Sequence, residues 1–166
     1  MIIEEKPFSS TYYRLASCGL QRMEDRHADV IGRTLACMDP WRRMGYTATG
    51  LFRYLIRNDP SQYRYSIVLA EEIAGLVCVR YPWLRGPYIE LLAVFSPYQG
   101  RHFGREVIGW AMNEMMQIAG NVWATVSSFN TPARLFYQNN GFVEIAELPE
   151  LVNSGFNEIL LRKKCA

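Results

Sequence analysis

The sequence predicts a mixed α/β (α+β) fold built as a single domain over residues 1–166. Segments with apolar residues at helical spacing alternate with runs rich in β-branched and aromatic residues. Neither a repeat nor a low-complexity linker interrupts this alternation, and 166 residues suit one domain with a proper core. The expected order of elements is β-α-α-β-β-β-α-β-α-β-β.

The N-terminal part predicts one strand and two helices. The strand is expected from Thr11 to Leu15. A helix is expected in MEDRHADVIGRTLACMDP, where the pattern ends at Asp39-Pro40. A second helix is expected from about Thr47 to Arg57, after the loop WRRMGY. The apolar stripe of the first helix consists of Met23, His27, Val30, Ile31, Thr34, Leu35 and Met38.

Three strands are expected next. RYSIVLA and AGLVCVRY are β-rich runs joined by a short acidic turn at Glu71-Glu72, which predicts a hairpin. GPYIELLAVF is the third strand, and Gly86-Pro87 marks its beginning.

Helical spacing returns after GREV, and the helix is expected to be capped by Gly120. NVWATVSS predicts a strand, NTPARLFYQNN a short helix that ends at Gly141, and FVEIAEL and GFNEILLRK two final strands. The apolar stripe of the long helix consists of Val107, Ile108, Ala111, Met112, Met115, Ile118 and Ala119. Its other face consists of Glu106, Trp110, Asn113, Glu114 and Gln117.

Composition narrows the class of protein. Hydrophobic residues make up 49% of the chain and charged residues 20%, which is ordinary for a globular protein. A net charge of +2 gives no basic field for nucleic acid, and no apolar run approaches the roughly 20 residues of a membrane span. The acidic N-terminus MIIEEKPFSS is unlike a signal peptide. Widely spaced cysteines predict reduced thiols in a cytoplasmic protein without a zinc site: Cys18, Cys37, Cys78 and Cys165.

The stretch SPYQGRHFGREVIGW places two glycines, a histidine and two arginines between a strand and a helix. Unpaired N–H groups at such a helix start can bind a phosphate or pyrophosphate, and Arg101 and Arg105 would add positive charge. The stretch has neither a P-loop nor a dinucleotide-binding pattern. By itself the stretch is more typical of a loop-to-helix turn with solvated arginines.

LAVFSPYQGRHFG, followed by NTPARLFYQNNGF, resembles the GNAT superfamily of acetyl-CoA-dependent N-acetyltransferases. The resemblance implies a mostly antiparallel central sheet with helices on both faces, and CoA pyrophosphate bound by the glycine loop. His102 replaces the inner glycine of the family motif, and Gly100 is an extra glycine. Gly104 is expected to leave room for the phosphates. The implied cofactor residues are Leu92, Ala93, Val94, Gln99, Gly100, Arg101, His102, Phe103, Gly104 and Arg105.

The second block matches the family at Asn130, Ala133, Phe136, Tyr137, Gly141 and Phe142. The resemblance implies that Asn130 lies beside the pantetheine arm and that Tyr137 is the general acid that protonates the departing thiolate. The strands around Val94 and Ser128 would splay apart to admit pantetheine. Asn130 is equally typical of a helix cap, and Tyr137 of a core aromatic residue.

Glu90 stands in an otherwise apolar strand, and strict alternation puts it on the face of Leu92 and Val94. A partly desolvated carboxylate there is a candidate general base, and an ion pair with an arginine is equally compatible. His27 is interpreted as a packed histidine, and no proton transfer is assigned to His102. The acceptor side is predicted at Trp41, Arg42 and Tyr46, where a solvated loop is the alternative.

These observations predict a metal-free enzyme that transfers acetyl from acetyl-CoA to a primary amine of a small molecule or peptide by direct attack. The oxyanion would meet a backbone N–H near Val94. The alternative is a non-catalytic acyl-CoA-binding sensor or scaffold module. Nucleic acid and membrane are not expected as partners, and a homodimer is left open.

Overall fold

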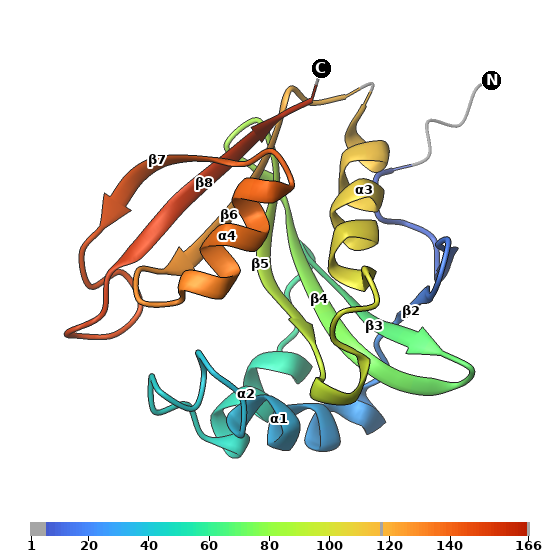
Figure 1. Cartoon of the computed structure of the whole chain (residues 1–166). Coiled ribbons are helices and arrows are strands. Elements are labelled where there is room, and N and C mark those ends of the chain that lie inside the picture. Colours follow the sequence, from blue (N-terminus) through green and yellow to red (C-terminus); the bar gives the residue numbers. More distant parts are fainter. Residues whose placement is uncertain (1–5, 117, 166) are drawn as a thin grey trace.

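The computed structural model describes residues 6–116 and 118–165 and contains one eight-stranded sheet (Figure 1). The strand order is β1-β2-β3-β4-β5-β6-β8-β7, and every neighbouring pair is antiparallel except β5 and β6. The strands are β1 (Tyr12–Arg14), β2 (Gly19–Arg22), β3 (Gln62–Leu69), β4 (Glu72–Trp83), β5 (Gly86–Val94), β6 (Asn121–Ser127), β7 (Val143–Leu148) and β8 (Glu158–Lys164).

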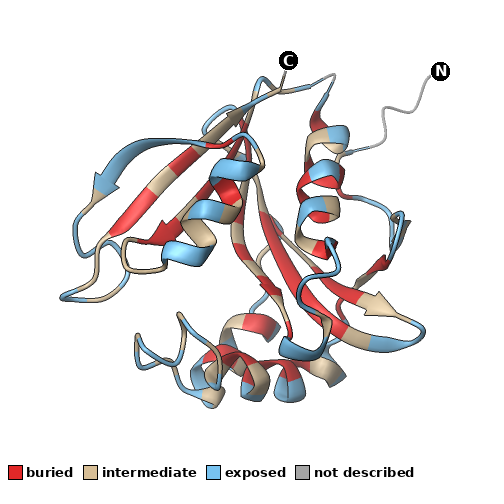
Figure 2. Ribbon diagram, viewed as in Figure 1, coloured by how far each residue is buried: buried red, intermediate tan, exposed pale blue. Residues whose placement is uncertain are grey.

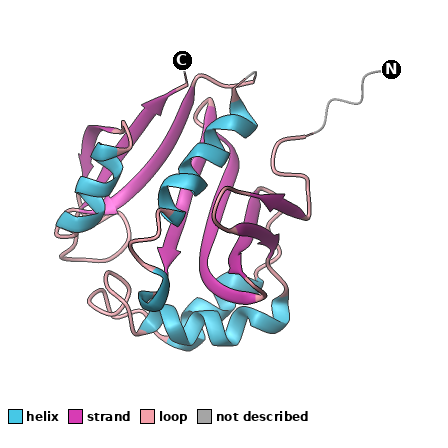
Figure 3. Ribbon diagram, turned by 45° about the vertical axis from the view of Figure 1, so that its right-hand side comes forward, coloured by secondary structure: helices cyan, strands magenta, loops and turns pink. Residues whose placement is uncertain are grey.

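The helices are α1 (Ala28–Ala36), α2 (Ala48–Ile56), α3 (Phe103–Met115) and α4 (Thr131–Asn139). They form two cores with the sheet (Figures 1 and 3). The α3/α4 core includes Val107, Ile108 and Tyr137, and the α1/α2 core includes Ile31 and Leu55. Buried residues of the sheet and of the inward helix faces supply both cores (Figure 2). The predicted mixed sheet with helices on both faces is confirmed.

The predicted order of elements is confirmed except for β2, which is an addition. GLQR is too short and too polar to give a strand pattern, and it becomes a strand because its residues pair with both β1 and β3. The predicted β3–β4 hairpin is confirmed, but its turn is Ala70-Glu71, one residue before the predicted Glu71-Glu72. Ala70 and Glu71 at its turn both have positive φ, 47° and 69°, as a tight two-residue hairpin turn requires.

The first predicted helix is shorter than its sequence pattern. It begins at Ala28, after a single 3-10 turn over Asp25–His27, and Val30 is 51% exposed. Val30 was therefore wrongly placed on the buried stripe. The predicted stripe included Met23 and His27, which precede the helix, whereas the buried residues of α1 are Ala28, Ile31, Gly32 and Leu35.

The long helix also differs from its prediction. It ends at Met115, so Ile118 is exposed and Gly120 is no helix cap; the Gly120 carbonyl accepts from the Cys165 amide instead. Trp110, predicted on the outer face, is 5% exposed. Gln117 lies outside the described residues.

The N-terminal segment covers the outer face of α3 and explains the burial of Trp110. The Trp110 ring contacts the rings of Phe8, Tyr13 and Tyr65 at centroid distances of 5.1 to 5.3 Å. Glu114 on the same face accepts hydrogen bonds from the Phe8 amide and the Tyr13 hydroxyl. A face that is polar in sequence is therefore part of the α3/α4 core.

The strands β5 and β6 are in register at only two positions, Tyr88 with Trp123 and Ile89 with Ala124. Beyond these pairs β5 continues beside β4 to Val94, whereas β6 continues beside β8 to Ser127 (Figure 1). The predicted splay of these strands is confirmed. None of the described helices has the length and apolar character that a membrane crossing requires.

Replacing Trp110 with Ala is expected to lower the free energy of unfolding by about 3–5 kcal/mol, the range for removing a buried aromatic ring. Trp110→Phe should lose much less, because the buried indole Nε1 has no hydrogen-bond partner among the described residues and Phe keeps a ring. Urea denaturation measures both, with the exposed Asn113→Ala on the same helix as the control. Equal midpoints for Trp110→Ala and Asn113→Ala would contradict the assignment of Trp110 to the core.

Candidate active site

A cavity of about 330 Å³ opens where β5 and β6 separate. Its walls come from the α1–α2 loop, α2, β5, β6, α4 and the beginning of β8. Among the described residues, its lining does not include Arg42, Ala93, Val94 or residues 99–105. The predicted site residues that the structure brings together there are Trp41, Tyr46, Glu90, Leu92, Asn130 and Tyr137.

The backbone of β5 faces the opening at alternate residues. The Phe95 amide donates to a β4 carbonyl at 2.8 Å, so alternation along an antiparallel pair directs the polar groups of Leu92 and Val94 away from β4. The Val94 carbonyl accepts a hydrogen bond from Gln99 Nε2 at 2.9 Å. Ala93 has the opposite orientation, and its side chain is buried in the α1/α2 core. Leu92 and Val94 therefore present backbone donors to the opening, whereas Ala93 does not.

The glycine loop leads directly into α3. His102 has a φ of 66° and precedes the first helical residue, so it adopts the left-handed conformation that glycine adopts without steric cost. Among the described residues, no acceptor is found for the backbone amides of residues 100–105. The side chains of Arg101 and Arg105 are exposed beside them. The loop thus has at His102 the left-handed backbone conformation that glycine adopts readily. It also combines free backbone N–H groups with the positive charges of Arg101 and Arg105.

Gly104 and Phe103 have packing roles within this loop. A Cβ added at Gly104 would lie 2.9 Å from Cζ of Phe136 on α4. Phe103 is 3% exposed and belongs to the α3/α4 core. A side chain at position 104 would therefore require the Phe136 ring to shift, and the expectation that Gly104 leaves room for the phosphates stays a prediction.

Tyr137 lies at the boundary between the core and the cavity. Its ring is 6% exposed and contacts the rings of Phe136 and Phe142 at 5.2 and 5.1 Å. Burial raises the pKa of the Tyr137 phenol, and Tyr88 adds to the shift. The phenol is therefore protonated at neutral pH. Asn130 caps α4, because its side chain accepts from the Ala133 amide at 3.3 Å, and it also lines the cavity.

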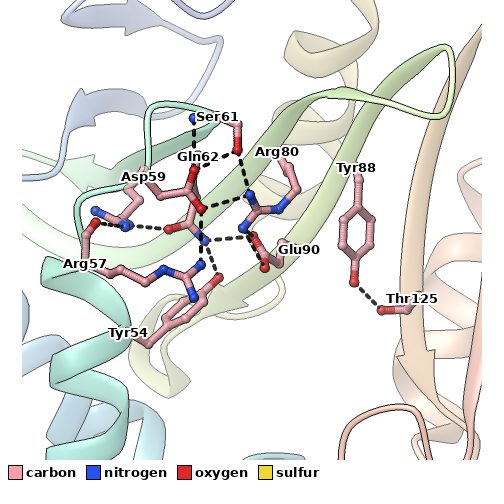
Figure 4. Close-up of polar contacts among 10 residues, drawn as sticks. Tyr54, Arg57, Asp59, Ser61, Gln62, Arg80, Tyr88, Glu90 and Thr125 are labelled. Atoms are coloured by element: carbon pink, nitrogen blue, oxygen red, sulfur yellow. Dashed lines mark hydrogen bonds and ion pairs between the residues drawn. The ribbon is translucent and has the colours of Figure 1, made fainter.

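Glu90 belongs to an ion-pair network on the sheet (Figure 4). Arg80 Nη2 donates to both carboxylate oxygens at 3.1 and 3.2 Å, and Gln62 Nε2 donates to one at 2.7 Å. Arg80 also pairs with Asp59, and Gln62 also contacts the Tyr54 hydroxyl. The ion pair with an arginine that was left open for Glu90 is therefore present.

A β-bulge places Glu90 on the opposite face from the one expected. Cys78 is in register with Leu91 and the next β4 residue with Ile89, so Glu90 is the extra residue. Glu90 bonds to Gln62, which contacts α2, whereas Leu92 packs in the α3/α4 core. Strict alternation failed because a bulge inserts one residue and reverses the facing of the residues beyond it.

Glu158 was not identified from the sequence as a site residue. It begins β8, is 5% exposed and lines the cavity. Its carboxylate accepts a hydrogen bond from Ser127 Oγ at 2.8 Å, and burial raises its pKa. The only available signal was a carboxylate in front of the apolar run ILL, in a segment interpreted as an ordinary final strand.

The α1–α2 loop forms one wall of the cavity. Trp41 and Tyr46 from this loop line it, and their contact with an acceptor stays a prediction. Arg42 is exposed and pairs with Asp39 at 3.1 Å. The loop is tied to the far side of the opening because the Met44 carbonyl accepts from Asn153 Nδ2 at 3.2 Å. The structure therefore places aromatic rings, but not Arg42, at the cavity.

Several known structures share this fold. An acetyltransferase from Thermus thermophilus is 18% identical, with 92% of this chain and 99% of that chain covered and a TM-score of 0.70. A spermidine N-acetyltransferase variant from Vibrio cholerae is 16% identical, with 90% and 94% covered and a TM-score of 0.66. A Bacillus anthracis protein described as a streptothricin acetyltransferase, in complex with acetyl coenzyme A, is 24% identical, with 67% and 66% covered and a TM-score of 0.57.

No curated protein matches the sequence significantly. A family model matches residues 26–142, which is more than half of the chain. The matched part includes β5, the glycine loop that follows it, α3 and α4. Its description is the acetyltransferase (GNAT) family. The match spans both motifs that predicted the family and the separated strands that bring them together. The chain therefore belongs to the acetyltransferase (GNAT) family.

Proposed function

We propose that the chain is an N-acetyltransferase that moves the acetyl group of acetyl-CoA to a primary amine by direct attack. The opening between β5 and β6 carries this proposal, because its cavity brings together the Leu92 backbone, a protonated tyrosine and two carboxylates. The cysteines are free thiols, which supports a reducing compartment such as the cytoplasm.

The chain has groups that fit acetyl-CoA, which would supply an acetyl group activated as a thioester. The backbone groups of Leu92 and Val94 are suited to pair with the pantetheine amides, as in strand addition. The free amides of residues 100–105, with Arg101 and Arg105 nearby, are suited to the pyrophosphate. The liganded Bacillus anthracis neighbour, which contains acetyl coenzyme A, supports the same donor.

Tyr137 is the proposed general acid, and the Val94 N–H the proposed donor to the oxyanion. When the C–N bond forms and the C–S bond breaks, the Tyr137 hydroxyl gives its proton to the departing sulfur. The phenolate can recover a proton from the attacking nitrogen. Burial keeps the Tyr137 phenol protonated but also raises its pKa and makes it a weaker acid, so its proton transfer to the sulfur must be coupled to the breaking of the C–S bond.

Glu90 is the base proposed from the sequence, and it does line the cavity. Arg80 and Gln62 occupy both of its oxygens, so an amine must displace one of these donors to reach the carboxylate. Trp41 and Tyr46 are proposed to contact the acceptor. Arg42 is proposed only as a charge at the entrance, because its side chain pairs with Asp39 outside the cavity.

The function is tested by incubating the protein with acetyl-CoA and a panel of primary amines and measuring thiol release. Thiol release that depends on an amine, with the acetylated amine identified by mass spectrometry, is the expected result. Calorimetry should also show tighter binding of CoA than of pantetheine, which lacks the phosphates. Tight CoA binding without turnover on any amine would favour the non-catalytic acyl-CoA-binding alternative.

His102→Gly is expected to keep CoA affinity within about threefold, because glycine adopts the left-handed conformation found at position 102. His102→Val should weaken binding by about tenfold or more, because a β-branched residue strongly disfavours positive φ and would reorient the amides of the loop. Calorimetry with CoA measures both. Similar affinities for the Gly and Val variants would show that the loop conformation does not control binding.

Tyr137→Phe is expected to lower turnover by roughly 10²–10⁴-fold, the range for losing a general acid. CoA affinity and the unfolding midpoint should change little, because Phe keeps the ring that packs between Phe136 and Phe142. Steady-state kinetics, CoA calorimetry and urea denaturation provide the three measurements. Unchanged turnover in a variant that binds CoA normally would exclude Tyr137 as the acid.

A further inference from the structure

We propose that Glu158 binds the positively charged amino group of the acceptor, and that the acceptor carries a single such group on a compact apolar body. The inference rests on the proposed function and adds the chemical class of the acceptor to it. Its basis is a carboxylate buried in the wall of the cavity without a compensating cation.

Glu158 and Glu90 line the same cavity, but they differ in whether a positively charged side chain pairs with the carboxylate. Glu90 is paired with Arg80, so its negative charge is offset. Glu158 is 5% exposed and accepts one hydrogen bond, from Ser127 Oγ, and within residues 6–116 and 118–165 it forms no ion pair. A buried carboxylate in this condition is unfavourable until a cation or a proton neutralises it.

The polar groups near Glu158 on the surrounding elements are hydroxyls and phenols: Ser127 on β6, Tyr46 on the α1–α2 loop and Tyr88 on β5. The neighbour on β7 is the apolar Leu148, which is in register with Glu158. Burial raises the pKa of the Tyr46 phenol, and the nearby charge of Glu158 raises it further. Among the described residues that line the cavity, none is Lys, Arg or His. Any cation that pairs with Glu158 inside the cavity must therefore come from a ligand.

The rest of the cavity is suited to an apolar body next to that cation. Aromatic rings of Trp41, Tyr46, Tyr54 and Tyr88 line it, and such rings attract an ammonium group and pack against hydrocarbon. One uncompensated carboxylate in about 330 Å³ matches one ammonium group. A polyamine would find no second uncompensated carboxylate among the described lining residues for its further charges, because Glu90 is already paired with Arg80.

The binding test uses two amine and alcohol pairs of similar shape, butylamine with butanol and benzylamine with benzyl alcohol, and also spermidine. Calorimetry at neutral pH with saturating CoA measures their affinities. Wild type should bind at least one amine about tenfold more tightly than its alcohol, and spermidine no more tightly than that amine. No preference for amine over alcohol would overturn the proposal, as would spermidine binding tenfold more tightly than both monoamines.

Glu158→Gln keeps the shape of the side chain and removes its charge. It should lose the preference for amine over alcohol while CoA affinity is retained, and Glu71→Gln at the exposed β3–β4 turn is the matched control. Undiminished amine affinity in a Glu158→Gln variant that binds CoA would overturn the proposal. The wild-type comparison of amine with alcohol needs no variant, so the proposal can still fail if Glu158→Gln does not fold.

The pH dependence of stability gives a second readout. Burial raises the folded-state pKa of Glu158 above its usual value of 4.5, so the folded state keeps this proton to higher pH than the unfolded state. Wild type should therefore lose stability relative to Glu158→Gln as the pH rises from about 4.5 through the raised pKa. A difference between the two proteins that is independent of pH would overturn the claim of an uncompensated carboxylate.

These outcomes separate the inference from the proposed function. Amine binding that depends on Glu158, without acetyl transfer to any amine, would contradict the proposed function and leave the ammonium site in place. Acetyl transfer to an amine with undiminished amine affinity and rate in Glu158→Gln would support the proposed function and overturn the ammonium site.

Discussion

The structure depends on a constraint at the centre of the sheet, the pairing of β5 with β6 over only two residue pairs. Each strand is held on its other edge, β5 by β4 as far as Val94 and β6 by β8 as far as Ser127. Neither strand can follow the other without giving up these antiparallel ladders. The backbone groups of Leu92 and Val94 are therefore left without a strand partner. The cavity and its unpaired backbone have the same origin.

The two cores supply different parts of the site to this opening. The α3/α4 core positions the glycine loop and Tyr137, since α3 begins directly after His102 and Phe136 packs against Gly104. The α1/α2 side supplies the aromatic wall, and the two carboxylates reach the cavity from the same side. The groups proposed to hold the acetyl donor thus come from one face of the sheet, and those proposed to contact the acceptor from the other. The proposed reaction would take place between the separated strands β5 and β6, where the opening connects the two faces of the sheet.

Electrostatic environment distinguishes two glutamates that share one cavity. Glu90 is part of a chain of charges that continues through Arg80 to Asp59, where hydrogen bonds from Ser61 and Arg80 lower the pKa of the Asp59 carboxyl. Glu158 has a single hydroxyl partner, and its burial has the opposite effect on its pKa. The first arrangement ties β3, β4 and β5 together, and the second leaves a charge for a ligand to complete. Residue type alone does not reveal this difference.

Local pattern was sufficient for the order of the main elements, for the β3–β4 hairpin to within one residue of its turn, and for the two motifs that identify the family. These features are encoded by neighbours in the chain. Tertiary structure decided the rest. Trp110 became a core residue because a distant N-terminal segment covers it, and Glu90 changed face because β4 and β5 pair through a bulge. The environment of Glu158 depends on Ser127, a partner on another strand, and periodicity along one segment carries no information about such a contact.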